Sequence, residues 1–202
     1  MRYFSFIILL LLSFSCTSVS QEKGDTVKAV SDTIISNAND SLLPHRITLL
    51  FAGDLMQHQG QINAARTPAG YDYSDCFKFV KEEISRADIA IANLEVTLGG
   101  KPYRGYPAFS APDEYLSAIR EAGFNVLITA NNHCLDRGKK GLERTILMLD
   151  SLCIPYAGTY TNAETREQRY PLMIEKNGFR IVLLNYTCLL YTSPSPRDAH
   201  ES

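Results

Sequence analysis

The sequence has no excess of charge of either sign. Its 20 Lys and Arg residues nearly balance 22 Asp and Glu residues, so the formal net charge is -2, and no segment concentrates the basic residues. Proteins that bind nucleic acid usually carry a basic patch against the phosphates. We therefore expect no nucleic-acid partner. The content of 45% hydrophobic and 21% charged residues indicates a globular chain with a core.

Cysteine is also scarce, and its positions are irregular. Five Cys residues show neither a disulfide framework nor the paired spacing of a zinc site. Cys16 belongs to an N-terminal signal described below, and Cys188 lies in an anomalous C-terminal segment. We expect the remaining three, Cys76, Cys134 and Cys153, to be free, buried thiols.

Only one long hydrophobic run is present, over residues 3–14. It is shorter than the roughly 20 residues that span a membrane, and it has the proportions of a signal-peptide core. The run ends in Ser13-Phe14-Ser15-Cys16, which resembles a bacterial lipobox. We predict a lipoprotein-type signal peptide over 1–15, lipidation of Cys16, and export to the cell envelope with a membrane anchor. The alternative is a Cys that happens to lie near an ordinary cleavage site.

Residues 16–44 are rich in Ser, Asp, Asn and Thr, which is typical of a flexible tether. A folded domain is expected over 45–187, where apolar runs alternate with amphipathic segments. The expected strands are 46–52, 88–92, 125–130 and 154–158, followed by a hairpin of 172–176 and 179–186 around Asn177-Gly178. Helices are expected over 57–66, 76–86, 112–122 and 141–152. This order predicts an α/β layered domain.

Polar side chains follow three of the expected strands. Asp54 follows the first, Asn93 and Glu95 follow the second, and Asn131-Asn132-His133 follow the third. Ligands bind at the carboxyl ends of parallel strands, so we expect these groups to meet there. Carboxylate and amide oxygens suit hard divalent cations, and imidazole suits Mn, Fe or Zn. Two such ions can hold a phosphoryl group and activate a water molecule.

Each of these residues also has an ordinary explanation. Asp54 could cap a turn, Glu95 could be a surface charge, and the two Asn residues could be turn residues. His133 alone could be a hydrogen-bonded structural imidazole. Recurrence at successive strand ends favours a site over these explanations. His58 is a weaker ligand candidate, because its Gln-rich neighbours indicate an exposed helix.

Three motifs stand out, namely Gly53-Asp54-Leu55-Met56, Asn93-Leu94-Glu95 and the segment Asn131-Asn132-His133-Cys134-Leu135-Asp136-Arg137-Gly138. Together they resemble the CapA family, the poly-gamma-glutamate capsule synthesis proteins of the calcineurin-like metallophosphatase superfamily. The resemblance covers roughly 45–187. It implies a metallophosphatase-like sandwich of two β-sheets flanked by helices, and two divalent metal ions in the intact protein.

The resemblance also implies residue roles. Asp54, Glu95 and Asn132 would be metal ligands, with Glu95 at the place of a bridging carboxylate. His133 would contact substrate or act as an acid, and Asp136 would orient it. Asn93 and Asn131 would bind substrate.

Two departures stand beside the resemblance. Met56 occupies the place where the superfamily has a His two residues after the Asp, and no His lies between His133 and His200 to supply the later His motifs. Residues 188–202 begin Cys-Leu-Leu-Tyr-Thr-Ser-Pro-Ser-Pro-Arg-Asp, which matches the translated codons of a transposon-end sequencing adaptor. We therefore expect 188–202 to be non-native, and the domain to be C-terminally truncated near Thr187.

Two functions are consistent with these patterns. The first is a metal-dependent phosphoester-type hydrolase in capsule, poly-gamma-glutamate or other envelope polymer biosynthesis, acting on an envelope polymer or phosphoester substrate. The second is a non-catalytic factor that binds or assembles an envelope polymer on the same fold.

Overall fold

The structure is a computed structural model that describes residues 46–187. The expected signal peptide over 1–15, the lipidated Cys16, the tether over 16–44 and the non-native segment over 188–202 all lie outside the described residues. Among residues 46–187, none of the helices combines the length and the apolar character needed to cross a bilayer.

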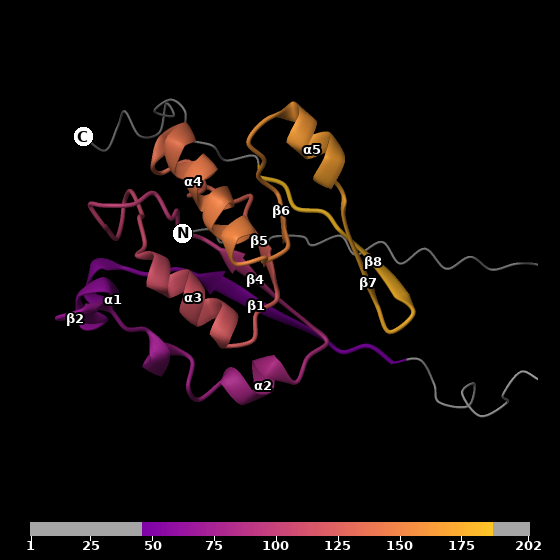
Figure 1. The fold of residues 1–202 in the computed structure, drawn as a ribbon, viewed down its shortest axis with the longest axis horizontal. Coiled ribbons are helices and arrows are strands. Elements are labelled where there is room, and N and C mark those ends of the chain that lie inside the picture. The colour runs from indigo at the N-terminus through magenta and orange to yellow at the C-terminus, as the bar shows by residue number, and fades with distance from the viewer. Residues whose placement is uncertain (1–45, 188–202) are drawn as a thin grey trace, which may run out of the picture. The chain divides into compact units, whose positions relative to one another are not determined.

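A parallel four-stranded sheet forms the centre of the domain, in the order β1-β4-β5-β6 (Figure 1). Its strands are β1 (Leu49–Leu55), β4 (Ile89–Leu94), β5 (Val126–Ile128) and β6 (Tyr156–Ala157). The helices are α1 (Gln59–Ala64), α2 (Lys81–Ser85), α3 (Asp113–Glu121), α4 (Gly138–Ser151) and α5 (Ala163–Arg169). The expected α/β architecture, a sheet with flanking helices, is confirmed.

The central strand β4 is buried on both faces, which explains its nearly continuous apolar sequence Ile-Ala-Ile-Ala-Asn-Leu. One face of the sheet packs against α3 and α4, where Leu116, Ile119 and Leu149 are fully buried. Their spacing along each helix is the reason these segments form amphipathic helices. This arrangement leaves the carboxyl ends of the strands free for polar loops.

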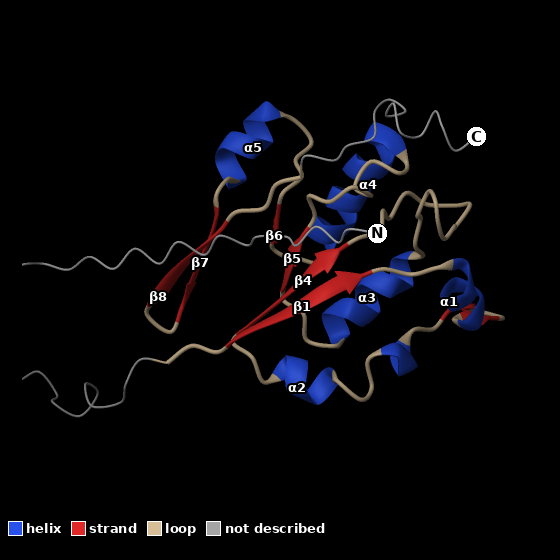
Figure 2. Cartoon of the chain, turned by 180° about the vertical axis from the view of Figure 1, so that it is seen from behind, coloured by secondary structure: helices blue, strands red, loops and turns tan. Residues whose placement is uncertain are grey.

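The opposite face packs against a separate antiparallel hairpin, β7 (Leu172–Lys176) and β8 (Phe179–Leu183). Asn177 and Gly178 both have positive φ, at 52° and 80°, as the two-residue turn requires. In Figure 2, β1 and β4 have no helix in front of them, and the hairpin lies to their left. Phe51 of β1 stays 46% exposed. The hairpin therefore covers this face only in part.

Several boundaries differ from expectation. β1 continues through Gly53 and Asp54 to Leu55, with a register irregularity between Phe51 and Asp54, so Asp54 lies within a strand and not after it. The helix expected over 76–86 is a 3₁₀ turn, Ser74–Cys76, followed by the short α2. A two-stranded ladder of β2 (Arg66–Thr67) and β3 (Gly70–Tyr71), and helix α5, were not expected.

The cysteine prediction was right in one respect and wrong in another. Cys76, Cys134 and Cys153 are free, but Cys76 and Cys153 are exposed and Cys134 is half-buried. Cys76 closes the 3₁₀ turn, and Cys153 takes a positive φ of 52° beyond the end of α4. Both therefore lie in connecting segments at the surface, where a side chain is not packed into the core.

Candidate active site at the carboxyl edge of the sheet

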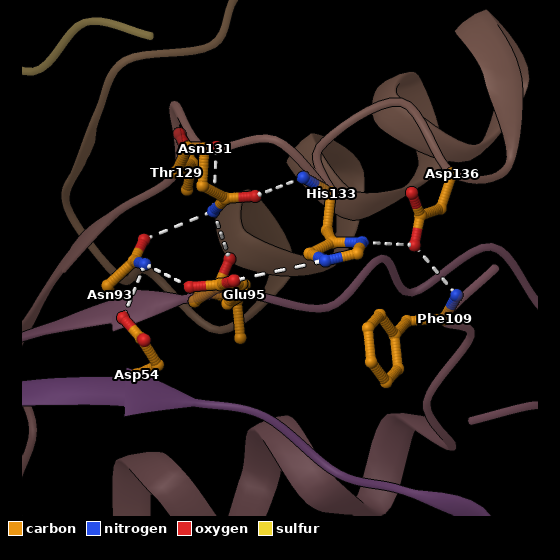
Figure 3. A network of polar contacts seen from close by, with 9 residues as sticks. Asp54, Asn93, Glu95, Phe109, Thr129, Asn131, His133 and Asp136 are labelled. Atoms are coloured by element: carbon orange, nitrogen blue, oxygen red, sulfur yellow. Dashed lines mark hydrogen bonds and ion pairs between the residues drawn. The ribbon is translucent and has the colours of Figure 1, made fainter. Parts of the chain in front are cut away.

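Most of the polar residues expected to meet do so at the carboxyl ends of β1, β4 and β5, namely Asp54, Asn93, Glu95, Asn131 and His133 (Figure 3). Parallel pairing sets this arrangement. Asp54 of β1 lies beside Asn93 of β4, and Asn93 lies beside Ile128 of β5. The loop after β5 then places His133 above the end of β4.

Asn93 connects two carboxylates. Its Nδ2 donates to Asp54 Oδ1 at 2.8 Å and to Glu95 Oε2 at 2.9 Å. Asp54 is exposed, whereas Glu95 is only 8% exposed. Two like charges this close repel each other, and the amide hydrogens of Asn93 offset part of that repulsion. Asn93 therefore acts as a spacer that holds the carboxylate pair together.

Asn131 fixes the path of the loop that follows β5. Its side chain is buried, at 1% exposure, and its Nδ2 donates to Asn93 Oδ1 at 3.1 Å and to the Leu94 carbonyl at 2.9 Å. Its Oδ1 accepts from the His133 backbone N–H at 3.0 Å. These bonds give Asn131 a structural function that the sequence did not indicate. They do not test whether Asn93 and Asn131 also bind substrate, which stays a prediction.

His133 is held in a defined orientation. Its Nδ1 lies 2.9 Å from Asp136 Oδ2, and the same oxygen accepts from the Phe109 backbone N–H at 2.8 Å. A carboxylate accepts hydrogen bonds, so in this pair Nδ1 of His133 is the donor to Asp136. Nε2 is then the ring nitrogen that can contact another group. The ring packs edge-on against Phe109, with centroids 4.7 Å apart, and Nε2 lies 4.0 Å from Glu95 Oε1. The imidazole therefore faces the carboxylate pair.

Burial and the neighbouring negative charges raise the pKa of Glu95 to about 7. Desolvation is the largest cause, followed by the charge of Asp54 and a hydrogen bond to it, and then by the charge of Asp136. The hydrogen bond from Asn93 opposes the shift. The site therefore has more negative charge than its own donors balance, as expected where a cation binds.

The residues present fit part of a divalent metal site. Asp54 and Glu95 supply two adjacent hard oxygen ligands, and the Asn132 side chain makes no hydrogen bond within residues 46–187. Residues 46–187 contain no group of three or more His, Cys, Asp and Glu residues arranged to hold a metal ion. The described part of the chain thus provides a carboxylate pair and not a complete coordination shell. The assignment of Asp54, Glu95 and Asn132 as metal ligands stays a prediction.

A comparison with protein families decides which family the chain belongs to. The model of a family described as "Bacterial capsule synthesis protein PGA_cap" matches residues 48–202, which is more than half of the chain. The chain belongs to the PGA_cap family. This confirms the family relationship indicated by the three sequence motifs.

Individual curated proteins are also similar to this chain. The "Capsule biosynthesis protein CapA" of Bacillus anthracis is 28% identical over 148 residues, which are 70% of this chain and 35% of CapA. The "Uncharacterized protein y4sH" of Sinorhizobium fredii is 30% identical over 155 residues, which are 72% of this chain and 32% of that protein. The chain spans about a third of the length of these curated relatives.

Two residues that contact this PGA_cap site were missed by sequence reasoning. Phe109 was an unremarkable aromatic in the sequence, yet its backbone and ring contact both members of the Asp136–His133 pair. Asn185, just after β8, accepts from the Ala130 N–H at 2.6 Å and the Thr129 N–H at 3.1 Å, and donates to the Ala130 carbonyl at 3.3 Å. No local pattern signals a contact across 55 residues of sequence.

Gly158 provides the space for this Asn185 contact. A Cβ at Gly158 would lie 2.1 Å from Asn185 Oδ1 and 2.5 Å from the Ala130 nitrogen, and its φ of +121° is itself a glycine conformation. Asn185 thus ties the end of β8 to the backbone directly before Asn131. The hairpin and the site loop are connected through one amide.

Replacing Asn185 by alanine should lower the free energy of unfolding by about 1–3 kcal/mol, because it leaves the N–H and carbonyl of Ala130 without this partner. Chemical denaturation of the protein would measure the loss. Asn185→Asp should recover only part of the loss, since its carboxylate still accepts from both N–H groups but places an acceptor against the Ala130 carbonyl. An Asn185→Ala protein of unchanged stability, with the Ala130 amide still protected from hydrogen exchange, would contradict the prediction.

Proposed function

We propose that this PGA_cap protein is a metal-dependent, phosphoester-type hydrolase acting in the biosynthesis of a capsule or another envelope polymer. One observation supports the proposal most. The imidazole of His133 is oriented by Asp136 and faces the carboxylate pair of Asp54 and Glu95 at the carboxyl edge of a parallel sheet. A structural histidine needs no such acidic surroundings. The combination suits transfer of a proton at a phosphoester.

In the proposed mechanism, the residues of this chain position a proton. Asp136 accepts from Nδ1–H of His133 and so directs Nε2 toward the carboxylate pair. When protonated, Nε2 would donate to the departing oxygen of the substrate. Phe109 covers one edge of the imidazole, which limits both its rotation and its access to water. Asn93 and Asn131 keep the carboxylates and the loop in register, and would bind substrate.

A divalent cation is the cofactor we propose, with Mn, Fe or Zn as candidates and two ions in the intact protein. Asp54, Glu95 and Asn132 would hold it on this chain. When bound, such an ion would supply charge stabilisation for the phosphoryl oxygens and a more acidic water. The fit rests on the crowded carboxylate pair and on the raised pKa of Glu95.

The setting of the reaction is part of the proposal. The sequence pattern before residue 45 supports an exported lipoprotein at the cell envelope, and the printed name of CapA concerns capsule biosynthesis. That name describes no hydrolysis, which favours a second candidate, a non-catalytic envelope polymer assembly factor. Turnover of a chromogenic phosphodiester with Mn²⁺ supports the enzyme. An assembly factor would bind Mn²⁺ but show no turnover.

Manganese should stabilise the protein more strongly at pH 8 than at pH 5, because protons compete with the cation for Glu95. At a Mn²⁺ concentration about 100 times its Kd, linkage predicts roughly 3 kcal/mol of added stability. Thermal unfolding with and without Mn²⁺ would measure it. Asp54→Asn should remove the effect. Asp75→Asn, which changes an exposed carboxylate that pairs with Lys78, should not. Equal stabilisation of both variants would contradict a site at Asp54.

A further inference from the structure

His58 and His133 are the two imidazole groups of residues 46–187, and both pack against the ring of Phe109. The ring centroids of His58 and Phe109 are 5.3 Å apart, and those of His133 and Phe109 are 4.7 Å apart. Both imidazoles stand nearly perpendicular to the phenyl ring, at 80° and 82°. The separation of the two imidazole centroids cannot exceed the sum of these distances, about 10 Å.

The backbone at His58 is fixed from three directions. Its N–H donates to Gln61 Oε1 at 2.6 Å, which ties it to the first turn of α1. Gly105 lies so close that a Cβ there would be 3.0 Å from the His58 carbonyl carbon. The preceding residue, Gln57, is 1% exposed, and its Oε1 accepts from the Tyr73 hydroxyl at 2.7 Å. The place of the His58 ring is therefore set before any ligand arrives.

The His58 side chain is nevertheless exposed, as its Gln-rich neighbours indicate. In the described part of the chain, the ion pairs of imidazole groups belong to His133, and the His58 ring has none. The residues on either side, Gln57 and Gln59, are uncharged. An exposed polar ring on a fixed backbone, next to a candidate active site, is the arrangement that a preorganised binding residue requires.

We infer that His58 is a second substrate-contacting residue, whose imidazole donates a hydrogen bond to a phosphoryl oxygen of the phosphoester at His133. The inference rests on the proposed function for the identity of the ligand, and the shared packing on Phe109 carries the rest. Two hydrogen bonds of about 3 Å each, together with one tetrahedral phosphoryl group and the radii of the two rings, span a separation of this size. An imidazole carries an N–H donor in both its neutral and its protonated form.

Binding can be measured without turnover, so this test stays separate from that of the hydrolase. The probe is phenylphosphonate, a phosphoester mimic whose P–C bond is not hydrolysed, titrated into the full chain in the presence of Zn²⁺. The imidazole NMR signals of His58 and His133 should both shift over the same range of probe concentration. A shift of the His133 signals alone would overturn the inference and leave the proposed hydrolase standing. The absence of a shift at either imidazole would overturn both.

A substitution that keeps the ring separates binding from packing. His58→Phe retains an aromatic contact with Phe109 but has no N–H donor, and it should weaken phenylphosphonate binding about tenfold through the loss of one hydrogen bond to a charged group. His58→Gln, which keeps an N–H donor without the ring, should lose less affinity. Asn63→Ala, at an exposed position of α1, is the matched control and should bind as the unchanged protein does.

The variants also give the results that would overturn the inference. Unchanged affinity in His58→Phe would show that His58 only covers the Phe109 ring. Equal losses in His58→Phe and His58→Gln would show that the N–H donor does not matter. In a turnover assay, the effect of His58→Phe should lie mainly in KM, whereas that of His133→Ala should lie mainly in kcat.

Discussion

His133→Ala should reduce phosphodiester turnover by a factor of about 10² to 10⁴, the usual contribution of a positioned acid or base. The reason is geometric, because Nε2 faces the carboxylate pair while Asp136 holds Nδ1. A steady-state assay with a chromogenic phosphodiester and Mn²⁺ measures the loss. The free energy of unfolding should change far less than the activation barrier, since the substitution removes one ring contact with Phe109 and one hydrogen bond to Asp136, whose oxygen keeps the Phe109 N–H.

Asp136→Asn is the companion variant, because one amide oxygen can still accept from the Phe109 N–H and from Nδ1–H of His133, while the negative charge beside the imidazole is removed. A smaller fall in kcat together with a shifted pH profile would indicate a positioning residue. If His133→Ala retained full turnover, the imidazole would be structural. The non-catalytic assembly factor would then be the better description.

Glu95 should make the metal-free protein less stable at pH 8 than it would be with this group protonated. The pKa of this group is about 7 in the folded protein and ordinarily 4.5. Between these pH values the folded state holds a proton on Glu95 that the unfolded state releases. The contribution of Glu95 to the free energy of unfolding is therefore fully present below about pH 4.5 and is lost as the pH rises through 7. The full difference is about 3 kcal/mol. Denaturation of chelator-treated protein across this range measures it.

Glu95→Gln should flatten this pH dependence and make the metal-free protein more stable at pH 8, because a neutral amide does not repel Asp54. Glu83→Gln, at an exposed position on α2, is the control and should leave the slope unchanged. If Glu95→Gln destabilised the protein at pH 8, the carboxylate would be paired with a group other than those described. A gain in stability from removing a proposed metal ligand is typical of functional sites.

Local sequence patterns were sufficient to predict those helices, strands and turns whose structure is determined by a single segment. The Asn177-Gly178 turn, the apolar run of β4 and the spacing in α4 each predicted the observed element. The meeting of Asp54, Asn93 and His133 also followed, because parallel strands align their carboxyl ends. These predictions required only the strand order along the chain and the pleat of one sheet.

The remainder depends on contacts between distant segments. Asp54 lies within β1 because β1 pairs with β4 as far as Leu94, a register that no property of Gly53-Asp54 alone reveals. The buried position of Asn131 depends on the Leu94 carbonyl, which needs a partner once β4 ends. The contact of Phe109 with Asp136 spans 27 residues. Tertiary partners decided each of these outcomes, and propensity did not.

The long reach of Asn185 has a consequence for biogenesis. Ala130 leaves the ribosome 55 residues before Asn185, which at about 5–20 residues per second is roughly 3–10 s. During that interval the loop that bears His133 is already synthesised, but the Asn185 side chain that bonds the Ala130 backbone is not. The loop that bears His133 should therefore be among the last parts of this domain to become protease-resistant during translation, although the strand before it is synthesised early.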